Sequence, residues 1–335
     1  MDTKPTPRRK PWSLRRKLLI FIPLIIVVLA LALGLGLGLT LGNDNGEETD
    51  DNNTAPSTPN TTLPWTPSVS DTWQIILLHP PIISSSRDQS TTPNVSIFDI
   101  DLFDTPKETI DRLHERGKKV ICYFSAGSYE DWRPDASEFQ PEDLGEKLDG
   151  WPGEKWVDLS SENVRRIMRD RISMAAEKGC DGVDPDNVDG YQNENGLSLT
   201  QDSSIDFITY LSAETRPFNL ALGLKNAGDI IPAVLPLVHF SVNEQCVEYG
   251  ECDTFEPFIA AGKPVFHIEY PDGAGAEQGL QSDVLGESCA KSGDGRGSEK
   301  FSTVLKRMDL DGWVEYCDGS VERTDVDESV GRETG

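Results

Sequence analysis

The chain has 335 residues, a length that suits one large domain or two smaller ones, and 37% hydrophobic residues, enough for a buried core. With 31 Lys and Arg against 57 Asp and Glu, its formal net charge is −26. This charge excludes nucleic acid as a partner, because two polyanions repel each other, and favours a cationic or neutral one. With four His in total, a His-rich metal site is not expected, and neither is a cofactor.

Residues 1–42 differ in charge from the rest of the chain. They hold seven basic residues and one acid, which leaves 24 basic and 56 acidic residues, a net of −32, in residues 43–335. Residues 1–17 are predicted to be a basic cytosolic tail. Residues 18–42 carry no charge and, at about 1.5 Å per residue, are long enough for a transmembrane anchor. The positive-inside rule then predicts a single-pass type II membrane protein with its main domain extracellular. A cleaved signal peptide, followed by secretion, is the alternative.

The remaining chain divides by composition. Residues 43–70 are rich in Ser, Thr, Pro and Asn and predict a solvated stalk. Residues 71–317 are predicted to form the globular domain, as a monomer, and residues 318–335 a polar C-terminal tail. Three Asn-x-Ser/Thr sequons on the predicted outer side are candidate glycosylation sites: Asn52, Asn60 and Asn94.

Six Cys in an extracellular domain indicate disulfides rather than a metal site, although six Cys allow 15 connectivities. Position along the chain favours three pairs: Cys122 with Cys180, Cys246 with Cys252, and Cys289 with Cys317. The first pair lies beside two predicted strands, the second closes a small loop, and the third ties a Gly-rich excursion to the domain.

Short apolar segments typical of buried strands recur along the domain. They lie at 73–78, 95–100, 120–124, 182–184, 220–225, 239–243, 265–269 and 301–305. Helical patterns fill several gaps, at 105–116, 163–178 and 203–216. Such alternation predicts a parallel sheet covered by helices, and eight strands predict an α/β protein with a (β/α)8 TIM barrel. An open doubly wound sheet is the alternative, but no G-x-G-x-x-G motif follows the first strand.

Carboxylates follow four of the eight predicted strands, at the strand ends where a barrel carries its active site. They are Asp99 and Asp101 after the second strand, Asp184, Asp186 and Asp189 after the fourth, Glu244 after the sixth and Glu269 after the seventh. Like charges held this close raise at least one pKa, and perturbed carboxyl groups cluster at functional sites. Other polar or aromatic residues near strand ends would line the same site: Tyr123, Tyr129, Tyr191, Lys225, Asn226, Asn243 and Tyr270.

Two functions fit the segment GVDPDNVD at 182–189. A calcium loop is one, but Pro185 and the missing Gly and Glu of an EF-hand argue against it. Glycoside hydrolysis is the other and needs two facing carboxyl groups, about 5 Å apart for retention and about 6.5–9.5 Å for inversion. Asp186 and Glu244 would face each other across the barrel mouth, so hydrolysis is favoured.

Six segments together resemble glycoside hydrolase family 114, the endo-α-1,4-polygalactosaminidases. They are FDIDLFD (98–104), VICYFSAGSYEDWRPD (120–135), GCDGVDPDNVDGY (179–191), LGLKNAG (222–228), FSVNEQC with its following EC (240–252) and KPVFHIEY (263–270). The resemblance implies a (β/α)8 hydrolase that cuts within α-1,4-linked galactosamine polymers, without a metal. It also implies that Asp186 and Glu244 are the catalytic acids. By position alone, Asp186 is assigned as the nucleophile and Glu244 as the acid/base, with Asp184 and Asp189 as rivals and Glu269 as a weaker one.

By the same resemblance, Asp99, Asp101 and neighbouring polar residues would bind substrate or tune pKa values. Two alternatives stay open. One is a glycosidase for another α-linked galactose or amino-sugar polymer, and the other is a carbohydrate-binding barrel without catalysis.

Overall fold

The computed structural model describes residues 64–86 and 90–331. Eight parallel strands lie in one sheet, hydrogen-bonded side by side in chain order, and a strand forms at each of the eight predicted positions. They are β1 (Trp73–Ile76), β2 (Ile97–Asp101), β3 (Lys119–Ser125), β7 (Gly182–Asp186), β8 (Ala221–Lys225), β9 (Phe240–Glu244), β10 (Val265–Glu269) and β11 (Ser302–Leu305). Because all eight run the same way, their carboxyl ends meet at one edge, which we call the catalytic edge.

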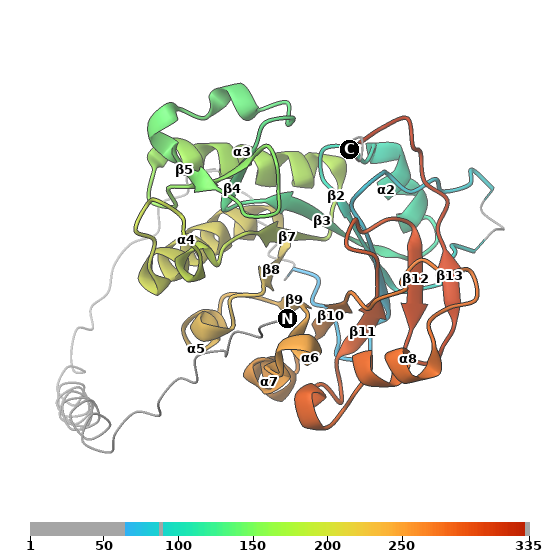
Figure 1. Cartoon of the computed structure of the whole chain (residues 1–335). Helices are drawn as coiled ribbons and strands as arrows, with labels where there is room; N and C mark the ends of the chain where they lie inside the picture. Colours follow the sequence, from blue (N-terminus) through green and yellow to red (C-terminus); the bar gives the residue numbers. More distant parts are fainter. Residues whose placement is uncertain (1–63, 87–89, 332–335) are drawn as a thin grey trace, which may run out of the picture. The chain divides into compact units, whose positions relative to one another are not determined.

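The helices lie outside the curled sheet (Figure 1). The three predicted ones are α2 (Lys107–His114), α3 (Glu162–Lys178) and α4 (Gln201–Thr215), and short ones follow: α5 (Ile231–Val234), α6 (Cys246–Tyr249), α7 (Glu256–Ala260) and α8 (Ser282–Ser288). Helix α3 begins where the Ser161 side chain accepts a hydrogen bond from the Val164 N–H, and it ends at Gly179 with φ +92°. Single 3₁₀ turns occupy Ala136–Glu138, Pro141–Asp143, Gly190–Gln192, Arg216–Phe218, Gly228–Ile230, Cys252–Phe255 and Gly293–Gly295.

Side chains alternate between the two faces of the sheet along each strand, and both faces are buried. On the outer face, Phe98 and Ile100 join the larger apolar cluster that packs under the helices. On the inner face, Phe240, Phe266 and Ile268 join a second cluster made mainly of residues from the strands themselves. A core enclosed by the sheet's own inner face is the arrangement of a barrel interior.

The two ends of the parallel run meet without a ladder of backbone hydrogen bonds. The Trp73 indole on β1 donates to the Ser302 carbonyl on β11 at 2.7 Å, but β11 pairs instead with β12 (Trp313–Tyr316), and β12 pairs with β13 (Val321–Arg323). The described sheet is therefore a curled, mixed sheet of ten strands. The sequence did not predict the two antiparallel strands, which occupy the edge of β11 that would face β1.

The chain forms a second, three-stranded sheet in the segment between β3 and α3. It contains β4 (Ser128–Glu130), β5 (Leu144–Lys147) and β6 (Glu154–Val157), in the antiparallel order β4–β6–β5. Because β4 follows β3 after a short turn, this small sheet lies on the catalytic edge.

The prediction of a polar C-terminal tail at 318–335 is wrong for the described part of that segment. Residues 321–323 form β13, the Asp327 N–H donates to the Pro80 carbonyl, and the Val330 carbonyl contacts the His79 ring. A polar sequence suffices here because backbone pairing, rather than apolar burial, holds this segment to the sheet.

All three predicted disulfides are present: Cys122–Cys180, Cys246–Cys252 and Cys289–Cys317. Of the three predicted glycosylation sites only Asn94 is described, and it is exposed, with its side-chain oxygen 2.6 Å from Lys118 Nζ.

The predicted cytosolic tail, anchor, most of the stalk, Asn52 and Asn60 lie outside the described residues. Within residues 64–86 and 90–331, no helix has the length and apolarity needed to cross a membrane.

Candidate active site

A buried lysine joins the two predicted catalytic carboxylates. Lys225, at the end of β8, places Nζ 3.2 Å from Asp186 Oδ2 at the end of β7 and 3.4 Å from Glu244 Oε2 at the end of β9. The lysine side chain is 2% exposed, whereas those of Asp186 and Glu244 are 16% and 22% exposed. The carboxylates are therefore open to a ligand, while their shared counter-ion is not.

Lys225 remains charged in this position. Burial alone lowers the pKa of a lysine, but Asp186, Glu244 and Asp184 raise the pKa of Lys225 well above its usual value. The resulting ammonium offsets the mutual repulsion of the acidic groups around it.

The shared lysine also limits the distance between the two carboxylates. Because Nζ is 3.2 Å from one oxygen and 3.4 Å from the other, these oxygens lie no more than about 6.6 Å apart. Retaining glycosidases hold their carboxyl groups about 5–5.5 Å apart, and inverting ones about 6.5–9.5 Å. The limit applies to this one pair of oxygens, and it includes the whole retaining range and only the lowest part of the inverting range.

Two tyrosines hold the carboxylates from neighbouring strands. Tyr123 on β3 donates its hydroxyl to Asp186 Oδ2 at 2.8 Å, and Tyr270 after β10 donates to Glu244 Oε1. Burial, followed by the charge of the adjacent carboxylate, raises the pKa of both phenols well above the usual value, so each remains a donor. Asn226 adds a further hydrogen bond, from Nδ2 to Glu244 Oε2 at 3.0 Å.

The backbone after Asp186 turns sharply and contributes another donor. Asn187 has φ +60°, its N–H donates to Asp186 Oδ1 at 2.7 Å, and its amide group bonds Ser125 and Ser128. This turn packs so closely on Gly127 that a Cβ there would lie 1.8 Å from the Asn187 carbonyl oxygen. The sequence analysis did not identify this turn. The one signal in the sequence was the residue type itself, because Asn tolerates the left-handed conformation better than most residues.

Two further carboxyl groups, on β2 and β7, lie near Lys225 in the interior of the sheet. Asp99 and Asp184 are fully buried, and neither carboxylate has a hydrogen-bond partner of good geometry among the described residues. Burial, reinforced by Asp186 and Glu244 and opposed by Lys225, raises the pKa of Asp184 to about 7. Burial and Asp184 raise the pKa of Asp99 well above its usual value. Both shifts favour the protonated form of these two buried acids.

The turn after Asp186 carries two other predicted residues. Burial and the charge of Asp186 raise the pKa of Asp189 to about 6, and burial raises the pKa of Tyr191 to about 12. Both are partly exposed. Tyr129, by contrast, packs edge-on against Phe139, with ring centroids 5.5 Å apart, as part of the small sheet.

Three predicted residues do not join the Lys225 group. Asp101 forms a two-point ion pair with Arg133, at 2.7 and 3.1 Å, and accepts the N–H groups of the following turn. Glu269 and Asn243 lie on the outer face of the sheet, because side chains alternate and Tyr270 and Glu244 take the inner positions. The sequence pattern located the strand ends but not which of two adjacent polar residues points inward.

A cavity of about 410 Å³ adjoins the site at Tyr270. It is lined by Tyr270–Ala274 and Lys306–Asp309, the segments that follow β10 and β11. Apart from Tyr270, the sequence analysis missed these residues. Lys306 directly follows the eighth predicted strand, so the rule that selected the other strand ends would also have found it.

The comparisons with known proteins agree with this geometry. Residues 54–322 match the model of the glycoside-hydrolase family GH114. The solved structure of Aspergillus fumigatus Ega3 in complex with galactosamine is 52% identical in sequence, with a TM-score of 0.69, over 78% of this chain and 100% of that one. The glycoside hydrolase domain of PelA from Pseudomonas aeruginosa shares the fold at 15% identity, with a TM-score of 0.55, over 76% of this chain and 99% of that one.

No curated protein gives a significant match. The family match nevertheless spans most of the chain, and it includes every residue of the carboxylate–lysine–carboxylate group described above. The chain therefore belongs to glycoside-hydrolase family GH114 and is a glycosidase.

Proposed function

We propose that this protein cleaves α-1,4-linked galactosamine polymers at internal linkages, with Asp186 as nucleophile and Glu244 as general acid and base. The observation that carries the proposal is the pair of ligand-accessible carboxylates held by one buried lysine. The galactosamine complex of the 52% identical Ega3 supports the choice of sugar.

In the first step, an Asp186 oxygen attacks the anomeric carbon while protonated Glu244 gives its proton to the leaving glycosidic oxygen. The C–O bond to the leaving sugar breaks, and a glycosyl ester on Asp186 forms. In the second step, Glu244 takes a proton from water, whose oxygen attacks the same carbon and releases Asp186. Two displacements retain the anomeric configuration, and the limit of about 6.6 Å between the facing oxygens allows this mechanism.

The charge of the domain supports a cationic polymer as substrate. The −32 net charge of residues 43–335 would attract protonated galactosamine units and speed their encounter with the enzyme at low salt. The cavity beside Tyr270 would hold a neighbouring sugar unit, where Asp272 and Asp309 offer carboxylate acceptors for hydroxyl or ammonium groups.

We also propose, from the sequence pattern, that residues 18–42 anchor the enzyme as a type II membrane protein, and that it acts outside the cell as a monomer. Secretion after cleavage is the competing outcome. The curled sheet and the family membership support the view that the eight parallel strands act as a (β/α)8 barrel.

The experiment incubates the purified protein with partly deacetylated galactosamine polymer and identifies the released oligosaccharides by mass spectrometry. Chitosan and an α-linked galactan are run in parallel, with Asp186→Asn and Glu244→Gln as controls. Galactosamine oligomers from the wild type alone would support the proposal. Cleavage of another glycan would overturn the substrate, and binding without cleavage of any glycan would indicate a carbohydrate-binding barrel.

A further inference from the structure

The backbone directly after Glu244 has a conformation that the surrounding structure must maintain. Glu244 is the last residue of β9, Gln245 adopts a left-handed conformation with φ +61°, and Cys246 begins α6. Left-handed conformations are unfavourable for residues other than glycine and persist where neighbouring contacts impose them. The orientation of Glu244 therefore depends on what holds the turn between β9 and α6.

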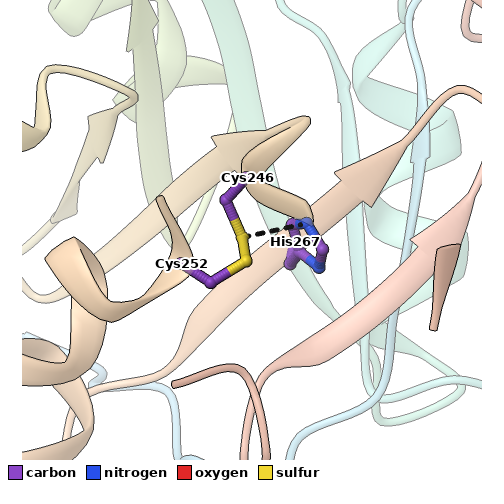
Figure 2. A group of neighbouring side chains, drawn as sticks. All are labelled: Cys246, Cys252 and His267. Carbon is purple, nitrogen blue, oxygen red and sulfur yellow. Dashed lines mark hydrogen bonds between the residues drawn. A yellow bond between two sulfur atoms is a disulfide. The ribbon is translucent and has the colours of Figure 1, made fainter. Parts of the chain in front are cut away.

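A buried cluster lies against this turn on the outer face of the sheet. It consists of the Cys246–Cys252 disulfide, His267 and Glu269, all at most 4% exposed. Figure 2 shows His267 pointing at the disulfide, with Nε2 3.3 Å from Cys246 Sγ. The same nitrogen is 2.8 Å from Glu269 Oε1, and the His267 Nδ1 atom is 3.0 Å from Thr303 Oγ1.

Two sulfurs and an imidazole at this spacing resemble a metal-ligand set. In the disulfide, however, the sulfurs are bonded to each other, and neither is the thiolate that a metal binds. The cluster must therefore be explained by its contacts with the protein.

The decisive contact is the hydrogen bond from the Val247 N–H to Glu269 Oε1, at 2.7 Å. Val247 lies in the first turn of α6, where backbone N–H groups have no partner within the helix, and the Gln245 side chain does not cap it. Glu269 therefore supplies the cap from the neighbouring strand. The disulfide holds the other end of the same turn by joining Cys246 to Cys252.

Glu269 and Tyr270 are consecutive, and they hold the Glu244 segment from opposite faces of the sheet. Tyr270 donates its hydroxyl to the Glu244 carboxylate on the inner face, while Glu269 accepts the Val247 N–H on the outer face. We infer that Glu269 is a positioning residue for Glu244, which acts through the Val247 N–H with His267 and the disulfide as its support. This inference rests on the proposed role of Glu244 as acid and base.

The test compares Glu269→Ala, which removes the acceptor, with Glu269→Gln, which keeps an oxygen for the Val247 N–H. Asp181→Ala is the matched control, because Asp181 Oδ2 likewise accepts a histidine nitrogen, His114 Nε2 at 2.8 Å, and a backbone N–H, that of Val120 at 2.9 Å. Asp181 directly precedes β7, at the edge of the sheet opposite the catalytic edge.

The readout separates positioning from general loss of structure. We use the polymer and a nitrophenyl glycoside of a galactosamine oligomer, whose leaving group departs without a proton from Glu244. For Glu269→Ala we expect kcat/KM on the polymer to fall by about 10- to 100-fold and kcat/KM on the nitrophenyl substrate to fall much less, because kcat/KM reports the first step, in which only the polymer needs the proton of Glu244. Glu269→Gln should recover most of the polymer activity, and Asp181→Ala should affect both substrates alike.

Equal losses of kcat/KM on the two substrates, or no recovery in Glu269→Gln, would overturn the inference while leaving the proposed function intact. Hydrogen exchange tests the structural step independently of turnover. We expect faster amide exchange in residues 244–250 of Glu269→Ala than in wild type, and no change there in Asp181→Ala. Unchanged exchange in this segment would overturn the inference, whereas a wild type that cleaves no galactosamine polymer would overturn the proposed function.

Discussion

Lys225 Nζ lies 3.2 Å from Asp186 Oδ2, and this buried ammonium is also within 3.4 Å of Glu244. A single cation therefore offsets the repulsion between the two carboxylates that we propose to be catalytic. The tyrosines and amides around them add hydrogen bonds, but among the described residues only Lys225 contacts both acids.

Replacement of Lys225 by Met should disable the site. Without the ammonium, the repulsion between the two carboxylates is no longer offset and both lose the ion-pair partner that holds them, so we expect kcat on the galactosamine polymer to fall by about 10²- to 10³-fold. Lys263→Met is the control, because Lys263 Nζ bonds the Leu235 and Val238 carbonyl oxygens at the opposite edge of the sheet. Steady-state kinetics of both variants test this expectation. An equal fall in kcat for the two variants would contradict the assigned role of Lys225.

Loss of the Tyr123 hydroxyl should affect chemistry more than stability. Tyr123→Phe removes the 2.8 Å hydrogen bond to Asp186, so we expect kcat to fall by about 10-fold or more, with KM little changed. Tyr210→Phe is the matched control, because it loses a hydrogen bond of 2.7 Å to the Arg165 carbonyl, between α4 and α3. A similar fall in kcat for both variants would show that the Tyr123 effect is not specific to the site.

Protonation of Asp184 should make stability depend on pH. Its pKa is about 7 in the folded protein against 3.8 ordinarily, so the folded state retains a proton that the unfolded state releases between these values. The contribution of this group to stability is therefore complete below about pH 4 and is lost as pH rises to about 7. Asp184→Asn should remove this dependence. The Tm of the variant minus the Tm of wild type should therefore increase as the pH rises from 4 to 8.

Asp143→Asn should behave in the opposite way. Burial alone raises the pKa of Asp143, but hydrogen bonds from Ser161, Asn163 and the Gln140 N–H leave it lowered. The stability that Asp143 contributes is thus present at neutral pH and lost on acidification. The Tm of Asp143→Asn should therefore fall furthest below the wild-type Tm at neutral pH. Thermal melts at several pH values test both variants, and parallel curves for Asp184→Asn and wild type would contradict the expectation for Asp184.

Two of the disulfides should differ in what their removal changes. Cys122–Cys180 spans 58 residues, and its loss should lower the unfolding free energy by about 4 kcal/mol, whereas Cys246–Cys252 spans six and should lower it by about 2 kcal/mol. Replacement of each pair by Ala, followed by urea unfolding, measures this order. Because the shorter disulfide supports the turn after Glu244, its removal should reduce kcat more, and the reverse ranking in kcat would argue against that support.

The sequence predicted the strands well because a strand buried on both faces is a nearly continuous apolar run. The segments WQIILL at 73–78 and VICYF at 120–124 are of this kind. The disulfide pairs also followed from position, because Cys122 and Cys180 lie beside adjacent strands. The small sheet from β4 to β6 was not predicted, since its strands of three or four residues carry no sustained alternation.

By itself the sequence determined the family, the eight parallel strands and the strand ends that carry the carboxylates, because local apolar patterns and short motifs encode all three. The tertiary structure decided which polar side chains meet. Glu269 and Tyr270 are neighbours in the chain, yet only Tyr270 reaches Glu244, since adjacent residues of a strand point to opposite faces. Lys225 and Asp184 acquire their shifted pKa values only when folding buries them among the other charges, and no linear pattern records that burial.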